Sequence, residues 1–213
     1  MQSTFAGPAR RGRAAAMPVI ACALAVAAAA CGSTTGATPA SSNHATASPS
    51  ASMTESAATI GTDCGMIPAA GMGSMHGMAM DPVVAAASHN PLITTLAAEA
   101  KKAGLAGTLN GAKGITVFAP DNAAFRKLTA HDMTMMSGTA ELARILRYHV
   151  VRGQITPAEL ASGMTLTTLE GGQLKASKMG STYEVNGAAI TCGNLHTANA
   201  TVYIINTVLM PAR

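Results

Sequence analysis

Tryptophan is absent from this chain of 213 residues, which contains only three tyrosines and three phenylalanines. Alanine and other aliphatic residues therefore supply most of the hydrophobic fraction of 48%. The length fits one domain with additional segments, and its core should be aliphatic rather than aromatic. In such a sequence the adjacent pair Tyr148 and His149 stands out and needs an explanation.

Charged residues are also scarce, at 11% of the chain, and the formal net charge is +4. Three of the basic residues, Arg10, Arg11 and Arg13, lie in a segment that is typical of a cleaved leader. Taking these three from the 14 basic residues leaves 11 against 10 acidic ones. A nearly neutral surface releases few counterions on binding DNA or RNA. We therefore expect no nucleic-acid partner.

The motifs of common enzyme classes are missing as well. The sequence contains no GxSxG, no HExxH and no phosphate-binding glycine loop. Asp121, Asp132 and Glu141 are scattered and are better explained as helix caps or surface charges. The sequence thus predicts a protein that is not an enzyme and needs no cofactor.

Residues 1–30 follow the order of a secretory signal peptide: basic residues, an alanine-rich apolar run, and small residues before Cys31. The run is only marginally apolar for a membrane span. The junction resembles a bacterial lipobox, although Ala28 stands where leucine is usual. Two outcomes remain open: lipidation of Cys31, with the protein held on the extracytoplasmic face of the cell membrane, or ordinary cleavage and secretion.

Residues 32–63 consist mainly of serine, threonine, alanine and proline, with Glu55 as the only charged residue before Asp63. Such a segment cannot bury enough apolar surface to offset the entropy lost on ordering. We expect a disordered tether there. The folded domain is predicted to span residues 64–213.

Local patterns within this domain place helices before most of the strands. A helix is expected over residues 88–103, with Ser88 or Asn90 as its cap and Pro91 in its first turn. Further helices are expected from a cap at Asp121 or Asn122, over residues 137–150 and from Thr156, and one strand is expected at 114–120. Short strands fill the remainder, and Asn186-Gly187 is typical of a hairpin turn. This order indicates an α+β fold.

Three stretches resemble the signatures of the fasciclin (FAS1) domain: "TVFAPDNAAFRKL" at 116–128, "LRYHVV" at 146–151 and "ANATVYIINTVLMP" at 198–211. Within that family the chain is similar to the single-domain secreted immunogenic proteins of mycobacteria and their lipoprotein sister. The resemblance implies a FAS1 fold, a roughly seven-stranded β-sandwich or wedge flanked by several short helices. It also implies adhesion or extracellular recognition without catalysis. The partner would be an extracellular protein or an envelope glycan, and the protein a monomer. Tyr203 stands where many members have histidine, so that residue's role does not carry over.

The resemblance makes Tyr148 and His149 candidates for partner recognition, but helical periodicity offers another interpretation. Position 149 continues the apolar stripe of Leu142, Ile145 and Leu146, whereas position 148 lies about 100° away. We therefore expect His149 to be buried and hydrogen-bonded. Tyr148 is expected at the surface.

Cleavage before Cys31 removes Cys22, and lipidation would occupy the thiol of Cys31, which leaves Cys64 and Cys192 in the domain. Two cysteines in an exported protein favour a disulfide.

Methionine is abundant just after Cys64, where residues 66–80 form a methionine- and histidine-rich arm. Thioethers with an imidazole suit Cu(I), and the candidate ligands are Met72, Met75, His76, Met78 and Met80. The alternative is that these methionines fill grooves on the domain. Copper handling and the carriage of a small lipophilic ligand in an internal pocket are thus two further functions to test.

Overall fold

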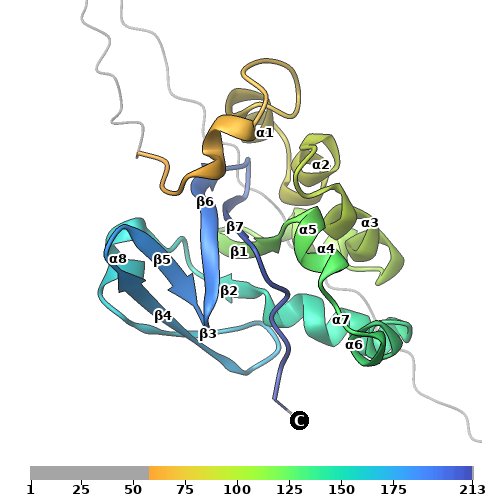
Figure 1. The fold of residues 1–213 in the computed structure, drawn as a ribbon. Coiled ribbons are helices and arrows are strands. Elements are labelled where there is room, and N and C mark those ends of the chain that lie inside the picture. The colour runs from red at the N-terminus through yellow and green to blue at the C-terminus, as the bar shows by residue number, and fades with distance from the viewer. Residues whose placement is uncertain (1–57, 213) are drawn as a thin grey trace, which may run out of the picture. The chain divides into compact units, whose positions relative to one another are not determined.

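The computed structural model describes residues 58–212 (Figure 1). The predicted signal peptide at 1–30, the lipidation candidate Cys31 and residues 32–57 of the predicted tether lie outside the described residues. No helix within residues 58–212 is both long and apolar enough to cross a membrane.

Short helices form the first part of the described chain. After the 3-10 turn η1 (Asp63–Met66) come α1 (Met75–Met80), α2 (Val83–His89), α3 (Thr94–Lys102) and α4 (Ala106–Gly111). The helix predicted over residues 88–103 is present as α3 but begins only at Thr94, and Ser88 is not its cap, because it lies inside α2, which ends at His89. Pro91 disfavours the helical conformation of Asn90, whose side-chain Oδ1 instead accepts a hydrogen bond from Leu92 N at 3.0 Å.

The middle of the chain alternates strands and helices: β1 (Ile115–Pro120), α5 (Asn122–Arg126), α6 (Ala130–Met135), α7 (Thr139–Tyr148), β2 (Val150–Arg152) and α8 (Pro157–Ala161). The Asp121 carboxylate accepts from Ala124 N and so caps α5. Thr129 with Asp132, and Thr156 with Glu159, form capping boxes on α6 and α8. Hydrogen bonds from the threonines lower the pKa values of Asp132 and Glu159.

The remaining strands are β3 (Thr165–Thr167), β4 (Gln173–Met179), β5 (Thr182–Val185), β6 (Ala188–His196) and β7 (Ala200–Ile205). One seven-stranded sheet has the order β2-β1-β7-β6-β5-β4-β3, with β1 and β7 parallel and the other pairs antiparallel. Asn186 and Gly187 join β5 to β6 with φ angles of 47° and 78°, as the predicted hairpin turn requires. The α+β fold with seven strands and short flanking helices is confirmed.

The sheet curls until its first and last strands meet. Val151 of β2 bridges Thr168, just beyond β3, and Leu169 N donates to Val150 O at 2.7 Å. The meeting of these two strands leaves little unpaired edge on which another chain could add a strand.

Two hydrophobic clusters fill this architecture. One lies between the helices and the sheet and is built almost wholly from Val, Ala, Leu and Ile side chains. The other lies inside the curl of the sheet and contains Phe118 and Tyr203, whose ring centroids are 5.8 Å apart. The core is therefore largely aliphatic, as expected from composition, and the buried aromatic side chains of the described residues are Phe118, Phe125, Tyr148 and Tyr203.

Candidate functional site

His149 is fully enclosed at the C-terminal end of α7, where 1% of its surface is exposed. Its Nδ1 lies 2.9 Å from Ile145 O, and its Nε2 accepts a hydrogen bond from Leu209 N at 2.9 Å. This pair of contacts requires the proton on Nδ1. Burial lowers the pKa of His149 from 6.5 to about 4, although the hydrogen bond to Ile145 opposes the shift. His149 is a neutral core residue, as the packing interpretation expects.

Tyr148 is also buried, with 6% of its surface exposed, so the expectation of a surface tyrosine is wrong. Its hydroxyl donates to Gln173 O and accepts from Asn186 Nδ2, both at 3.0 Å. The ring packs on Gly172, where a Cβ atom would lie 2.7 Å from a ring carbon. Helix α7 is covered on two sides, because its apolar stripe faces the first cluster while Tyr148 belongs to the second.

Tyr148 and His149 together connect α7 to β4, to the β5–β6 turn and to the segment after β7. We call this arrangement the α7 lock. Neither side chain is presented to a partner at the surface of the described domain.

Asn199, in the turn between β6 and β7, has a connecting role that the sequence reasoning missed. Its Oδ1 accepts from Val83 N at 2.8 Å, and its Nδ2 lies 2.7 Å from Leu109 O and 2.6 Å from Ala112 O. The side chain thus joins the turn to α2 and α4. A turn asparagine is common, and no local pattern indicates such distant partners.

The segment just before the arm is attached to β6 of the sheet. Cys64 and Cys192 form a disulfide with an S–S distance of 2.05 Å. Ile60 and Gly193 exchange two backbone hydrogen bonds of 3.2 and 2.7 Å. Gly61 has a φ of +105°, and a Cβ there would lie 2.2 Å from Thr191 O. The last residues of the predicted tether therefore already pack against β6.

The methionines of the arm fall into a buried group and an exposed group. Met78 is 2% exposed, and its Sδ accepts a hydrogen bond from Asn90 Nδ2 at 3.2 Å. Met78 is therefore occupied in the core, as the groove-filling interpretation predicts. The other arm methionines are open to solvent, with exposed fractions of 59% for Met66, 57% for Met72, 41% for Met75 and 73% for Met80.

Close backbone contacts hold α1 in place. Ser74 caps the helix by accepting from Gly77 N at 3.1 Å, and its hydroxyl donates to Gly71 O at 2.6 Å. A Cβ at Gly77 would lie 2.3 Å from Gly71 O, so a larger residue would push the helix off the preceding loop. The exposed sulfur atoms are thus carried on a tightly packed backbone.

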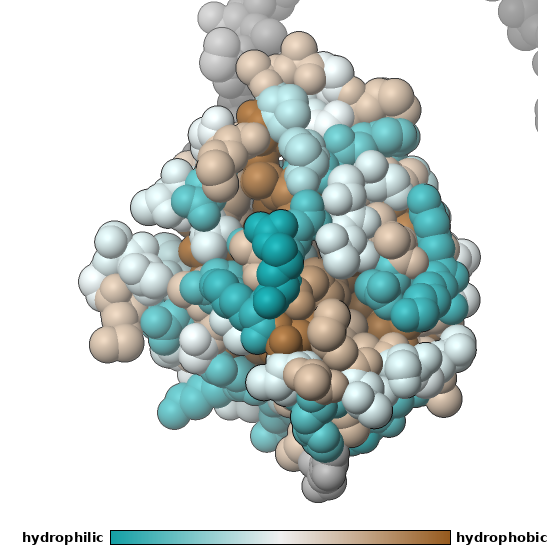
Figure 2. Space-filling model, turned by 45° about the vertical axis from the view of Figure 1, so that its right-hand side comes forward, coloured by the Kyte–Doolittle hydropathy of each residue, from teal (hydrophilic) through white to brown (hydrophobic). Residues whose placement is uncertain are grey.

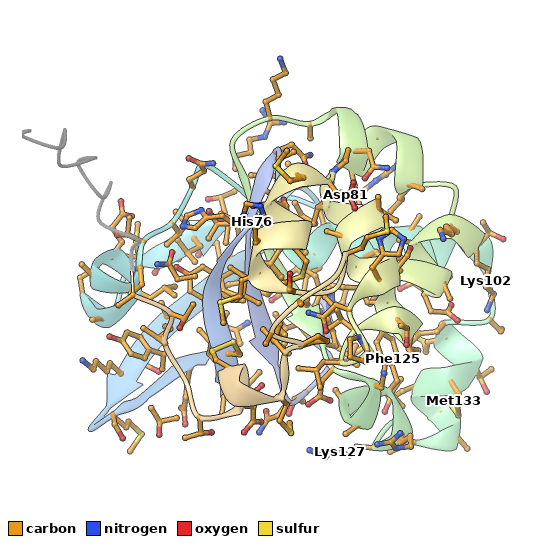
Figure 3. The ribbon with its side chains drawn as sticks, turned by 90° about the horizontal axis from the view of Figure 1, so that it is seen from above. His76, Asp81, Lys102, Phe125, Lys127 and Met133 are labelled. Atoms are coloured by element: carbon orange, nitrogen blue, oxygen red, sulfur yellow. A yellow bond between two sulfur atoms is a disulfide. The ribbon has the colours of Figure 1, made fainter. Side chains whose placement is uncertain are left out.

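His76, which Figure 3 labels on α1, borders two hollows of the domain. The first, of about 560 Å³, is formed by the loop before α1 and by α1 itself, and Met72 and Met80 line it. The second is shared with β6, and Met75 lines it. The predicted copper ligands are therefore brought together only in part, since Met78 faces the core.

Within residues 58–212, no group of three His, Cys, Asp or Glu side chains could hold a metal ion. The acidic residues that the sequence singled out have structural partners. Asp121 and Asp132 cap helices, and Glu141 lies 3.2 Å from Arg144 Nη1. The prediction that these carboxylates act as caps and surface charges agrees with their positions.

Two further cavities lie away from the arm. An apolar cavity beside His149 has a volume of only about 20 Å³, enough for one water molecule. A hollow of about 230 Å³ between α3, α5 and α6 is lined by Phe125 and Met133, far from His76 in Figure 3. On the face drawn in Figure 2, strongly apolar surface is visible only in narrow areas between polar side chains.

Known proteins are similar to this chain in sequence and in fold. The model of the Fasciclin domain family matches residues 91–211. Cell surface glycolipoprotein MPB83 of Mycobacterium bovis is 42% identical over 182 residues, which cover 81% of each chain. Immunogenic protein MPB70 of the same species is 42% identical over 161 residues, or 71% of this chain and 82% of the relative.

Among solved structures, a FAS1 domain pair from the insect cell adhesion molecule fasciclin I superposes with a TM-score of 0.51 at 15% identity. The match covers 63% of this chain and 52% of that one, and at this identity it supports the fold alone.

Proposed function

Since the chain belongs to the fasciclin domain family, we propose that it is an exported, lipid-anchored recognition protein of the cell envelope without catalytic activity. The observation that carries the proposal is its 42% identity to a cell surface glycolipoprotein over 81% of both chains. The small-residue junction before Cys31 supplies the attachment point, and residues 32–57 supply the tether.

The disulfide between Cys64 and Cys192 supports export, because disulfides form and persist in oxidising compartments. The carboxylates that the sequence singled out support a function without catalysis, because they act as caps or pair with arginine. The α7 lock stabilises the domain from within, so the contact surface for a partner has to lie elsewhere.

The anchoring part of the proposal is tested by Cys31→Ala in the producing cell. We expect the variant to move from the membrane fraction to the soluble extracytoplasmic fraction. Cys22→Ala is the matched control, because it changes the other cysteine of the same apolar run. If Cys31→Ala remains in the membrane fraction as firmly as the unaltered protein, the anchor is not at Cys31.

We expect the partner that the domain recognises to be an extracellular protein. The exported protein is immobilised and exposed to purified extracellular matrix proteins and, separately, to cell-wall glycans. Saturable binding to a protein, lost when the domain is denatured, is expected. Binding to glycans alone would mean that the partner is a glycan and not a protein. Binding to neither would contradict a function in recognition.

The structure supports the two alternative functions, ligand carriage and copper handling, to different degrees. Carriage of a lipophilic ligand inside the domain has no support from the cavity beside His149, at about 20 Å³. Copper handling keeps exposed candidate ligands in Met72, Met75, His76 and Met80. A Cu(I) titration of the protein separates this alternative from recognition.

A further inference from the structure

We propose that Met75 and His76 of α1 and His196 of β6 form a Cu(I) site. The three side chains line one hollow of about 340 Å³, together with Thr59, Ala79, Asn194 and Leu195. His196 lies far from the arm in the sequence and reaches it only because α1 packs against β6. The inference sharpens the copper alternative and does not depend on partner recognition.

The donor atoms select a soft metal ion. Two imidazole nitrogens and one thioether sulfur suit Cu(I), because methionine sulfur binds it in preference to hard cations. No carboxylate and no cysteine lines the hollow. A structural zinc site would need a fuller set of His, Cys or acidic ligands, which residues 58–212 do not bring together anywhere.

The histidines of the described domain differ in how far their ring nitrogens already have partners. His76 and His196 are exposed. In contrast, His149 is buried with both ring nitrogens in contact with the backbone, and His89 Nδ1 lies 3.4 Å from Asp81. Met75 is 41% exposed, whereas Met78, one turn further along α1, is occupied by its contact with Asn90.

The two elements that carry the ligands are fixed relative to each other. The disulfide at Cys192 and the backbone pairing at Gly193 hold the arm to β6, a few residues before His196. Ser74 and Gly77 fix the first turn of α1, which carries Met75 and His76. Copper binding therefore requires changes of side-chain rotamer rather than folding of a loose segment, and such preorganisation favours affinity.

The site is tested by anaerobic titration with Cu(I) in competition with a chromophoric Cu(I) chelator. The exported protein carries Cys31→Ser and has lost Cys22 with the leader, so that no thiol competes and only the disulfide cysteines remain. One equivalent of Cu(I) should bind, with much weaker binding of Zn(II). His76→Gln, His196→Gln and Met75→Leu should each weaken Cu(I) binding at least about tenfold, because even outer-shell substitutions cost that much in metal sites.

His131→Gln and Met179→Leu serve as matched controls. His131 lines a different hollow, and Met179 is 69% exposed at the end of β4. Both should bind Cu(I) like the parent protein. In the same titration, NMR signals of the Met75 methyl group and of the His76 and His196 rings should shift together.

Three results would overturn the proposal. The first is a parent protein that withdraws no copper from the chelator. The second is His196→Gln binding at full affinity while Met72→Leu or Met80→Leu loses it, which would place copper on the arm alone. The third is equal affinity for Zn(II) and Cu(I), which would mean that the thioether does not select the ion.

Discussion

The α7 lock and the arm place polar and soft groups in opposite environments. In the lock, an imidazole and a phenol are buried and every ring nitrogen or hydroxyl is hydrogen-bonded. In the arm, four methionines and one histidine of a single short segment are exposed. Buried polar groups with full sets of partners specify the fold. Exposed thioethers contribute little to stability and remain available to a ligand.

Removal of the disulfide should produce the largest effect on this contrast. Replacing Cys64 and Cys192 by serine opens a loop with a sequence separation of 128. The chain-entropy model assigns about 4–5 kcal/mol to such a loop. The domain should stay folded, because a chain of this size buries a sufficient core without a cross-link.

Chemical denaturation measures the loss of stability in the Cys64→Ser/Cys192→Ser protein, and hydrogen exchange locates it. Amides of residues 58–80 should lose protection while those of α7 and β7 keep theirs. If all of these amides lose protection together, the arm and the lock are one cooperative unit and the distinction between them fails.

His149→Ala tests the lock itself. The substitution leaves a cavity and removes the partner of Leu209 N, so the free energy of unfolding should fall by about 2–4 kcal/mol. His76→Ala is the comparison in the arm and should change it by no more than about 0.5 kcal/mol, because His76 is exposed. Equal losses in the two variants would show that exposure does not separate these histidines.

Acid should lower the free energy of unfolding of the unaltered protein through His149 of the lock. The pKa of His149 is about 4 in the folded protein, below the value of 6.5 expected when the chain is unfolded. The unfolded state therefore binds more protons between these values, and stability falls as the pH drops from 6.5 towards 4. This single group can remove up to about 3 kcal/mol.

Urea denaturation at a series of pH values follows this loss of stability. His149→Leu should show a shallower dependence on pH across this range than the unaltered protein. An unchanged slope in the variant would assign the acid sensitivity to other groups.

Tyr148→Phe should produce the smallest of these effects. The variant keeps the ring against Gly172 but leaves Asn186 Nδ2 and Gln173 O without the hydroxyl. A loss of about 1–2 kcal/mol in thermal unfolding is expected from the two hydrogen bonds. Tyr183→Phe is a suitable control, because Tyr183 is only partly buried. A Tyr148→Phe protein as stable as the control would mean that the hydroxyl contributes little to the lock.

Local signals in the sequence were sufficient for much of the fold. The strand predicted at 114–120, the cap at Asp121 or Asn122, the cap at Thr156 and the Asn186-Gly187 turn each depend on a few neighbouring residues. Each is present, with the strand at 115–120 and the cap at Asp121. The helix expected over 88–103 is shorter than predicted, because Pro91 disfavours the helical conformation of Asn90 and α3 begins only at Thr94.

The errors at the candidate sites have a long-range cause. Periodicity identified the face of α7 that carries His149, but it could not show that a second cluster covers Tyr148. It likewise could not show that His196 lies beside Met75 and His76, because that proximity arises from the packing of α1 on β6. Met78 and its exposed neighbours Met75 and Met80 are alike in the sequence and differ only in the direction in which α1 presents them.

The parallel pairing of β1 with β7 also governs when the domain can form. Strand β7 lies between β1 and β6, and Leu209 beyond it completes the contacts of His149. During synthesis, the centre of the sheet therefore stays open until β7 and Leu209 have left the ribosome. Contacts between such distant segments form slowly. A chain that has not finished folding is still extended enough to pass through a translocation channel. The order of its strands would therefore suit the proposed export, in which the protein crosses a membrane before it becomes compact.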